Sequence, residues 1–322
     1  MGGGTPTQLE PGDLRRLLAI VLERVDRGAV TELTVEANPG TLTPEKVAIL
    51  RDAGVTRMSL GAQTFDASRL AFLERIHEAR EIEDGVALLR EGGLDDFNLD
   101  LIYAIPGETV ESWLEDIRRA VALAPAHVSA YALTFEDGTP LGARKAKGLV
   151  SPPDEETQRR FFDATHAALE EAGYRAYEIS NFARPGRECR HNMNYWRNGE
   201  YFGLGPGAHS YVGGVRSANR RSLGHYVTEL AAGRLPRDFS ETLPADAAFG
   251  ETVMLGLRTV EGVSRRALAA RFGLDLAAVH AEIIRRHAAT GIVEWDGDRL
   301  RIRREHLAVA DSVAADFLEP PS

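Results

Sequence analysis

Three successive apolar runs near the start of the chain close with polar side chains. Glu36 closes the run 32–37, Gln63 follows the run 57–60, and Asp100 belongs to the run 97–102. In a sheet of parallel strands, a ligand lies beyond the carboxyl ends of the strands. We therefore expect these residues to present a carboxylate, an amide and a second carboxylate to one rim of the sheet.

Two further features suit a ligand at that rim. The segment Gly2-Gly3-Gly4-Thr5-Pro6 lacks bulky side chains, so its backbone groups can approach a ligand closely and grip a zwitterionic amino-acid end. Arg75 can bind a ligand carboxylate through its planar guanidinium. A glycine-rich start alone is more typical of a flexible end, and a lone strand-end glutamate often only caps a helix. Five such features at successive strand ends favour a binding site.

A second group of residues suits a porphyrin. The motif His191-Asn192-Met193-Asn194-Tyr195-Trp196 precedes a glycine-rich stretch, 201–210, that contains His209. Imidazole is a common haem-iron ligand, and flat aromatic side chains suit a porphyrin face. The alternative is that the His-Asn pair fixes a loop by hydrogen bonds while Tyr195 and Trp196 belong to the core. As haem-region candidates we take His191, Tyr195, Trp196 and His209, with His191 as the first choice for the iron ligand and His209 as the second.

The elements that must position these residues follow from hydrophobic periodicity. Between residues 8 and 135, helix-period segments alternate with short apolar runs, which predicts β-α units around a parallel sheet. Further strands are expected at 127–133 and 174–179, the second after a long helix that begins near residue 155 and ends at Gly173. Residues 181–214 are irregular, aromatic and glycine-rich, which favours an ordered loop that shapes a site.

The pattern changes again after Pro244. Helical segments near 246–258, 264–272 and 276–289 precede two short strands, 291–295 and 299–303, joined across Asp296-Gly297-Asp298. Three helices followed by a hairpin predict a small winged-helix-like domain. The expected division is a barrel-like domain over 1–180, a connecting region over 181–243 that carries the His191 motif, and a C-terminal domain over 244–322.

Composition limits the partners. The chain has 38 basic and 48 acidic residues, a net charge of −10, which disfavours nucleic acid and anionic membrane surfaces. A winged helix commonly enters a DNA groove. From residue 248 onward, however, there are 10 arginines and no lysine against 11 acidic residues, whereas a DNA reader should be basic. No run of apolar residues is long enough to span a membrane and no signal peptide is evident, so we expect a cytoplasmic protein.

The strand-end motifs resemble successive S-adenosylmethionine-binding motifs of the HemN/HemW group in the radical-SAM superfamily. The resemblance runs nearly end to end and includes the C-terminal domain. The motifs that carry it are Gly2-Gly3-Gly4-Thr5-Pro6, Glu36-Ala37-Asn38-Pro39, Leu60-Gly61-Ala62-Gln63-Thr64-Phe65, Arg75 with His77, and residues 98–109. The resemblance implies an α/β fold with a partial (β/α)6 barrel. It also implies that Gly3, Gly4 and Thr5 contact the methionine moiety and that Glu36 binds the ribose. Gln63, Arg75 and Asp100 match the remaining side-chain contacts to S-adenosylmethionine.

The chain departs from this family at one important feature. The family places closely spaced cysteines upstream of the glycine motif, where they hold a [4Fe–4S] cluster. This chain begins at the glycine motif, so we expect the cysteine loop and the first barrel strands to be missing, most simply through a shortened start. Cys189 is the sole cysteine and cannot replace a set of thiolates. Reductive cleavage of S-adenosylmethionine is therefore not expected of the chain as written.

The His191 motif distinguishes two functions within the family. Its His-Asn-x-x-Tyr-Trp pattern is similar to the signature of HemW-type haem chaperones and separates them from the coproporphyrinogen oxidases. The resemblance thus implies haem binding and delivery to haem-accepting proteins. The alternative is an oxygen-independent coproporphyrinogen III oxidase, an enzyme that decarboxylates a porphyrinogen. The sequence leaves the oligomeric state open.

Overall fold

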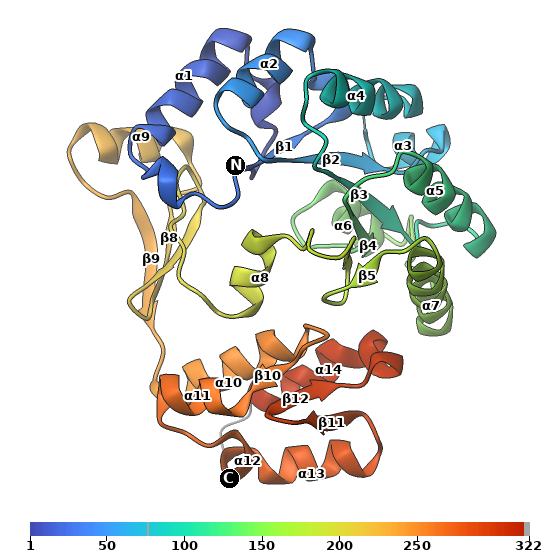
Figure 1. Ribbon diagram of the computed structural model, residues 1–322, viewed down its shortest axis with the longest axis vertical. Helices are drawn as coiled ribbons and strands as arrows, with labels where there is room; N and C mark the ends of the chain where they lie inside the picture. Colours follow the sequence, from blue (N-terminus) through green and yellow to red (C-terminus); the bar gives the residue numbers. More distant parts are fainter. Residues whose placement is uncertain (76, 319–322) are drawn as a thin grey trace. The chain divides into compact units, whose positions relative to one another are not determined.

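The protein consists of two compact units. A computed structural model describes residues 1–75 and 77–318 (Figure 1), and the units are Met1–Glu188 and Cys189–Ser322. The division after Glu188 lies later than the boundary expected after residue 180. The reason is that Asn181–Ala183 form a strand of the N-terminal sheet, whereas residues 189–243 belong with the C-terminal unit.

A largely parallel sheet forms the centre of the N-terminal unit. The four strands β1 to β4 are parallel, β6 pairs antiparallel with β4, and β5 pairs antiparallel with β6. The strands, in their order across the sheet, are β1 (Thr34–Ala37), β2 (Arg57–Gln63), β3 (Phe97–Tyr103), β4 (His127–Ala132), β6 (Asn181–Ala183) and β5 (Arg175–Ala176). The β-α pattern expected from the sequence is present, and the strand predicted at 174–179 is shorter than expected.

Helices follow one another around the outside of this curved sheet (Figure 1). They begin at the residues that the sequence suggests, because Thr43 and Asp154 accept the backbone N–H groups of Lys46 and Thr157 as N-caps. The helices of the unit are α1 (Pro11–Leu22), α2 (Pro44–Asp52), α3 (Ala67–Phe72), α4 (Ala79–Glu91), α5 (Val110–Ala122), α6 (Pro140–Ala146) and α7 (Glu155–Glu171).

The two faces of the sheet differ in polarity. The helix-covered face is apolar, since Tyr103 of β3 packs against Trp113 of α5 and Phe161 of α7. Leu99 of the same strand is buried, as are Val35, Met58 and Val128 on the neighbouring strands. The opposite face carries polar side chains in register across the strands, namely Glu36, Ser59, Asn98 and His127 in one row and Asp100, Ser129 and Asn181 in the next. Parallel strands are usually apolar on both faces. The polar face is therefore the candidate side of the sheet for a ligand.

The C-terminal unit begins with secondary structure that the sequence analysis did not predict. Helix α8 (Arg190–Trp196) carries the His191 motif. An antiparallel sheet follows, made of β7 (His209–Val212), β8 (Val215–Asn219) and β9 (Arg237–Thr242), and α9 (Leu223–Ala231) lies between β8 and β9 in the chain. The expectation of an ordered loop over 181–214 was wrong, since this range contains β6, α8 and β7. Strands β7 and β8 are mostly half-buried and β9 is mostly exposed. All three lack apolar alternation, so periodicity misses them. The Gly213-Gly214 turn, with both φ angles positive, was the available hairpin signal.

The remainder of this unit has the predicted order of helices followed by a hairpin. Strands β10, β12 and β11 form an antiparallel sheet, and Gly297 lies in the β11–β12 turn. The elements are α10 (Ala245–Leu257), β10 (Val263–Ser264), α11 (Arg265–Phe272), α12 (Leu276–Val279), α13 (Ala281–Ala289), β11 (Val293–Asp296), β12 (Arg299–Ile302) and α14 (Ala310–Ala315). Phe249, Leu257 and Phe317 lie in its core. In the part of the chain that the structure describes, no helix combines the length and apolarity needed to cross a membrane.

Gly262 and Gly273 allow a test of packing in the C-terminal unit. Both adopt positive φ angles, 67° and 70°, so alanine at either position is strained by about 1–2 kcal/mol. A Cβ at Gly262 would lie 2.1 Å from the Leu300 carbonyl oxygen, whereas a Cβ at Gly273 would meet nothing within 4 Å. We expect Gly262→Ala to lower the free energy of unfolding by a further ~1–3 kcal/mol relative to the control Gly273→Ala. Equal losses in thermal or urea unfolding would contradict this.

Candidate functional site

The glycine-rich N-terminal segment lies along β1. Met1 exchanges backbone hydrogen bonds with Thr34 and Glu36, and the Asn38 side chain donates to the Thr5 hydroxyl over 3.0 Å. A Cβ at Gly2 would fall 2.3 Å from the Glu36 carboxyl carbon. The missing side chain at Gly2 is thus what allows the Glu36 carboxylate to lie against this segment.

A buried lysine anchors the continuation of the segment. The Lys46 ammonium of α2 donates to the carbonyl oxygens of Thr7 and Thr41 over 2.7 and 3.2 Å. Thr7 is fully buried, and its hydroxyl lies 2.5 Å from that of Thr41. The start of the chain is therefore tied both to the end of β1 and to the helix that follows it.

Glu36 and Asp100 bring two carboxylates to the polar face. Burial is the main cause that raises the pKa of Glu36, and the Asp100 charge raises it further, while the Gly3 N–H lowers it by hydrogen bonding to the carboxylate. Burial also raises the pKa of Asp100, against the donors that surround it. Gly3, Glu36 and Asp100 thus belong to one electrostatic environment.

A chain of hydrogen bonds connects Asp100 to side chains of the neighbouring strands. Its two oxygens accept from Ser59 over 2.9 Å and from the Asn98 amide over 2.8 Å. The side-chain oxygen Oδ1 of Asn98 lies 2.7 Å from His127 Nδ1, and His127 Nε2 lies 2.8 Å from the Tyr177 hydroxyl. Burial lowers the pKa of His127 well below its usual value. A neutral His127 that donates from Nδ1 and accepts at Nε2 satisfies every member of the chain.

Gln63 occupies a bend at the end of β2. Its φ angle is +67°, and the register with β3 shifts between Leu60 and Gln63. Its side chain folds back beside Gly61, where a Cβ would lie 2.8 Å from Gln63 Nε2 and 3.2 Å from Asn38 Oδ1. The amide therefore lies near the residues that follow β1, as expected for a shared rim.

Arg75 and Gly4 are less closely tied to the other predicted residues. Both are exposed, and among the described residues the Arg75 guanidinium makes no hydrogen bond or ion pair with another predicted site residue. The nearby His77 is buried and its Nε2 lies 3.2 Å from the Ala62 carbonyl oxygen. His77 thus fixes its loop next to Gln63.

The sequence analysis did not predict several residues of the polar face. Ser59, Asn98 and Ser129 hydrogen-bond around Asp100. Tyr131 lies two residues beyond Ser129 on β4, and its pKa is raised by burial and further by the Asp100 charge. The signal was present, since polar residues alternate with apolar ones at a period of two in β2, β3 and β4. The predicted site residues were taken from the strand ends alone, and this alternation within the strands was not used.

Helix α8 divides the His191 motif between two sides. The exposed His191 ring lies edge-on to Tyr195, with centroids 4.7 Å apart, and Tyr195 contacts Tyr201 in the same way. Trp196 follows His191 by five positions, which places the two side chains roughly 140° apart around the helix. Trp196 instead lines a cavity of about 260 Å³ with Met193 of the same helix and residues of α10 and α11. His209 is exposed on β7.

The described residues do not supply ligands for an iron–sulfur cluster. Cys189 is buried and is the single cysteine of the chain. Within residues 1–75 and 77–318, no three His, Cys, Asp or Glu side chains are grouped so that they could hold a metal ion. A cluster requires several thiolates, so no role is assigned to one here.

Known proteins match nearly the whole chain. Residues 1–120 match the Radical SAM superfamily and residues 243–306 match the HemN C-terminal domain. The chain is 32% identical to the haem chaperone HemW of Bacillus subtilis over 99% of this chain and 84% of that protein. It is 37% identical to the haem chaperone HemW of Mycobacterium tuberculosis over 99% and 80%. The chain belongs to the HemW family.

A solved structure shares the fold of this HemW-family protein. Coproporphyrinogen III oxidase (HemN) from Escherichia coli, a radical-SAM enzyme, matches with a TM-score of 0.84 and 22% identity over 98% of this chain and 76% of that chain. The likeness confirms the predicted α/β fold, a partial radical-SAM-type barrel followed by a small winged-helix-like domain. At this level of identity it shows the fold alone.

The electrostatic coupling in the HemW-family site can be measured. Asp100→Asn removes a negative charge that raises the pKa of Glu36, so we expect that pKa to fall toward its usual range. Carbon-detected NMR titration of the glutamate carboxyl groups follows it directly. Asp163→Asn, which alters an exposed carboxylate paired with Arg159 on α7, is the matched control. An unchanged Glu36 titration in Asp100→Asn would show that the two carboxylates are not coupled.

Proposed function

We propose that this HemW-family protein binds haem and delivers it to acceptor proteins in the cytoplasm. The near full-length similarity to proteins named haem chaperone HemW supports the proposal. The observation that carries it is the exposed His191 on α8, held edge-on against Tyr195. An imidazole in that position is accessible to a ligand and is oriented by its aromatic neighbour.

The surroundings of His191 suit a ligand that must be released again. Haem supplies an iron that imidazole binds and a flat apolar ring that aromatic side chains contact. The cavity beside Trp196, at about 260 Å³, is smaller than the pockets that enclose drug-sized ligands. We infer that haem lies across the surface of α8 with much of its ring accessible to an acceptor. His209 is the second candidate ligand.

We also propose that the polar face of the sheet binds S-adenosylmethionine. The backbone of Gly3 and Gly4, with Thr5, would hold its methionine end, and Glu36 would accept the ribose hydroxyls. Gln63, Arg75 and Asp100 would complete the contacts. The glycine segment and the Glu36 carboxylate support such a site, because the absence of a side chain at Gly2 lets a backbone segment and a carboxylate lie side by side. When bound, this cofactor supplies a sulfonium group.

Haem ligation by His191 can be tested by spectroscopy. Removing an iron ligand should weaken binding by at least tenfold, about 1.4 kcal/mol, so we expect His191→Ala to shift the Soret band and raise the haem Kd. The exposed His225 of α9 provides the control variant His225→Ala. A Soret spectrum and affinity unchanged in His191→Ala but altered in His209→Ala would transfer the role to His209.

Delivery requires a separate measurement. We expect haem-loaded protein to transfer its haem to an apo-cytochrome b in a stopped-flow mixing experiment, at a rate faster than the same protein releases haem when no acceptor is present. Transfer that is no faster from the unaltered protein than from albumin would count against a chaperone function, whatever the outcome for ligation.

The cofactor site has an independent test. We expect Glu36→Ala to weaken binding of S-adenosylhomocysteine by about tenfold or more, since a hydrogen bond to a charged group contributes ~1.5–3 kcal/mol. Isothermal titration calorimetry measures this loss. Glu45→Ala on the outer helix α2, whose carboxylate is exposed, is the control and should bind normally. Equal affinity of both variants would remove Glu36 from the site.

A further inference from the structure

Two turns at the proposed cofactor site adopt a backbone conformation that side-chain-bearing residues avoid. Gln63 ends β2 with a φ angle of +67°, and Ala104 follows β3 with a φ angle of +60°. Such conformations persist only where the surrounding structure fixes them. The contacts that fix these two turns are therefore part of what shapes the site.

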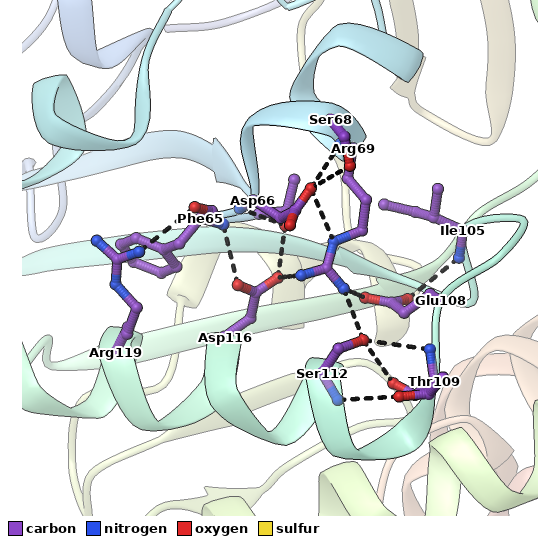
Figure 2. A network of polar contacts seen from close by, with 11 residues as sticks. Phe65, Asp66, Ser68, Arg69, Ile105, Glu108, Thr109, Ser112, Asp116 and Arg119 are labelled. Carbon is purple, nitrogen blue, oxygen red and sulfur yellow. Dashed lines mark hydrogen bonds and ion pairs between the residues drawn. The ribbon is translucent and has the colours of Figure 1, made fainter.

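Two buried carboxylates hold the residues that follow each turn (Figure 2). Asp116 of α5 accepts from the Thr64 hydroxyl over 2.5 Å and from the Phe65 N–H over 3.1 Å. Glu108 accepts from the Ile105 N–H over 3.2 Å. Asp116 thus fixes the chain after Gln63, and Glu108 fixes the chain after Ala104.

One guanidinium joins the two carboxylates. The Arg69 side chain of α3 donates to Glu108 over 2.6 Å and lies 3.5 Å from an Asp116 oxygen. Figure 2 shows it between them, with Ser112 on a third side at 3.0 Å. The side chains of Glu108 and Asp116 are 0% and 3% exposed, and that of Arg69 is 13% exposed. The exposed helix cap Asp66 lies 3.8 Å from Arg69 Nε.

We propose that Arg69, Glu108 and Asp116 are positioning residues that clamp the turns at Gln63 and Ala104 in the cofactor-binding form, and that the charge on Glu108 sets how firmly they are held. This inference rests on the proposed S-adenosylmethionine site. None of the three residues is expected to touch the cofactor. They act through Gln63 and through the loop 104–108.

The charge balance of the clamp gives the direction of the effect. One buried cation faces two buried carboxylates, so one negative charge is uncompensated when both are ionised. Burial raises the pKa of Glu108 to about 7, and the Asp116 charge adds to the rise, while Arg69 and the backbone N–H groups oppose it. The closed clamp therefore binds a proton more tightly than an opened one, in which Glu108 is hydrated. Raising the pH through 7 should favour opening.

Hydrogen exchange tests the clamp without any ligand. With a pKa of about 7 when closed and an ordinary value of 4.5 when open, linkage predicts about tenfold less protection at pH 8 than at pH 6 for the amides of Phe65 and Ile105, after correction for intrinsic rates. In Glu108→Gln, which is neutral at both pH values, this difference should disappear. Glu83→Gln, which alters a half-exposed partner of Arg119, should retain it.

Cofactor binding provides the second readout. Between pH 8 and pH 6 we expect the Kd for S-adenosylhomocysteine to fall at least threefold more in the unaltered protein than in Glu108→Gln. Comparing the two proteins removes the contributions of Glu36 and Asp100, which are common to both. Arg69→Met leaves two buried carboxylates unpaired and should lose protection at both turns. If that variant does not fold, Glu108→Gln still decides the matter.

The outcomes separate the clamp from the proposed site. Equal pH dependence of exchange in the unaltered protein and in Glu108→Gln would overturn the clamp. Loss of the pH dependence of exchange, with identical pH dependence of binding, would overturn its link to the cofactor. If the unaltered protein binds no S-adenosylhomocysteine at either pH, the cofactor site itself is wrong, and the positioning role falls with it.

Discussion

A carboxylate on the inner face of a sheet must be given hydrogen-bond donors, and Asp100 imposes this requirement on the N-terminal unit. Ser59 and Asn98 supply donors from β2 and β3, and His127 orients Asn98 from β4. The Tyr177 hydroxyl completes the chain. Because each partner belongs to a different strand or loop, the network also fixes the register between strands. A one-residue slip of any of these strands would turn its polar side chains to the apolar face.

The same unit combines an apolar outer face with a polar inner one, and the proposed cofactor site lies where the polar face opens to solvent. Asn98 and His127 are buried near the amino ends of their strands, whereas Glu36 and Tyr131 are exposed. The turns beyond the strand ends are strained and tied to α3 and α5 by buried charges. A fixed hydrogen-bond network around Asp100, together with turns held by the proposed clamp, would suit a site that must admit and hold a charged ligand.

The proposed haem-carrier function sets a different requirement for the C-terminal unit, since a carrier must hold its cargo and also release it. Helix α8 uses one side for packing, with Met193 and Trp196 at a cavity against α10 and α11, and Trp196 beneath the Arg258 guanidinium at 4.8 Å. On its other side His191 is exposed and Tyr195 is half-buried. This arrangement suits the proposed haem binding, because a short helix anchored on one side can present an imidazole without enclosing the ligand.

The sequence by itself determined the β-α order, the C-terminal helices with their hairpin, and the strand-end residues Glu36, Gln63 and Asp100, because each depends on local periodicity, caps or turn residues. It also carried the family resemblance. Only the tertiary structure decided which residues support Asp100, where the two units divide, and that Trp196 lies on a different side of α8 from His191. Strands β7 to β9 and the Arg69–Glu108–Asp116 clamp likewise escaped prediction. The strands lack apolar alternation, and the clamp depends on contacts between residues far apart in the chain, which leave no periodic trace in the sequence.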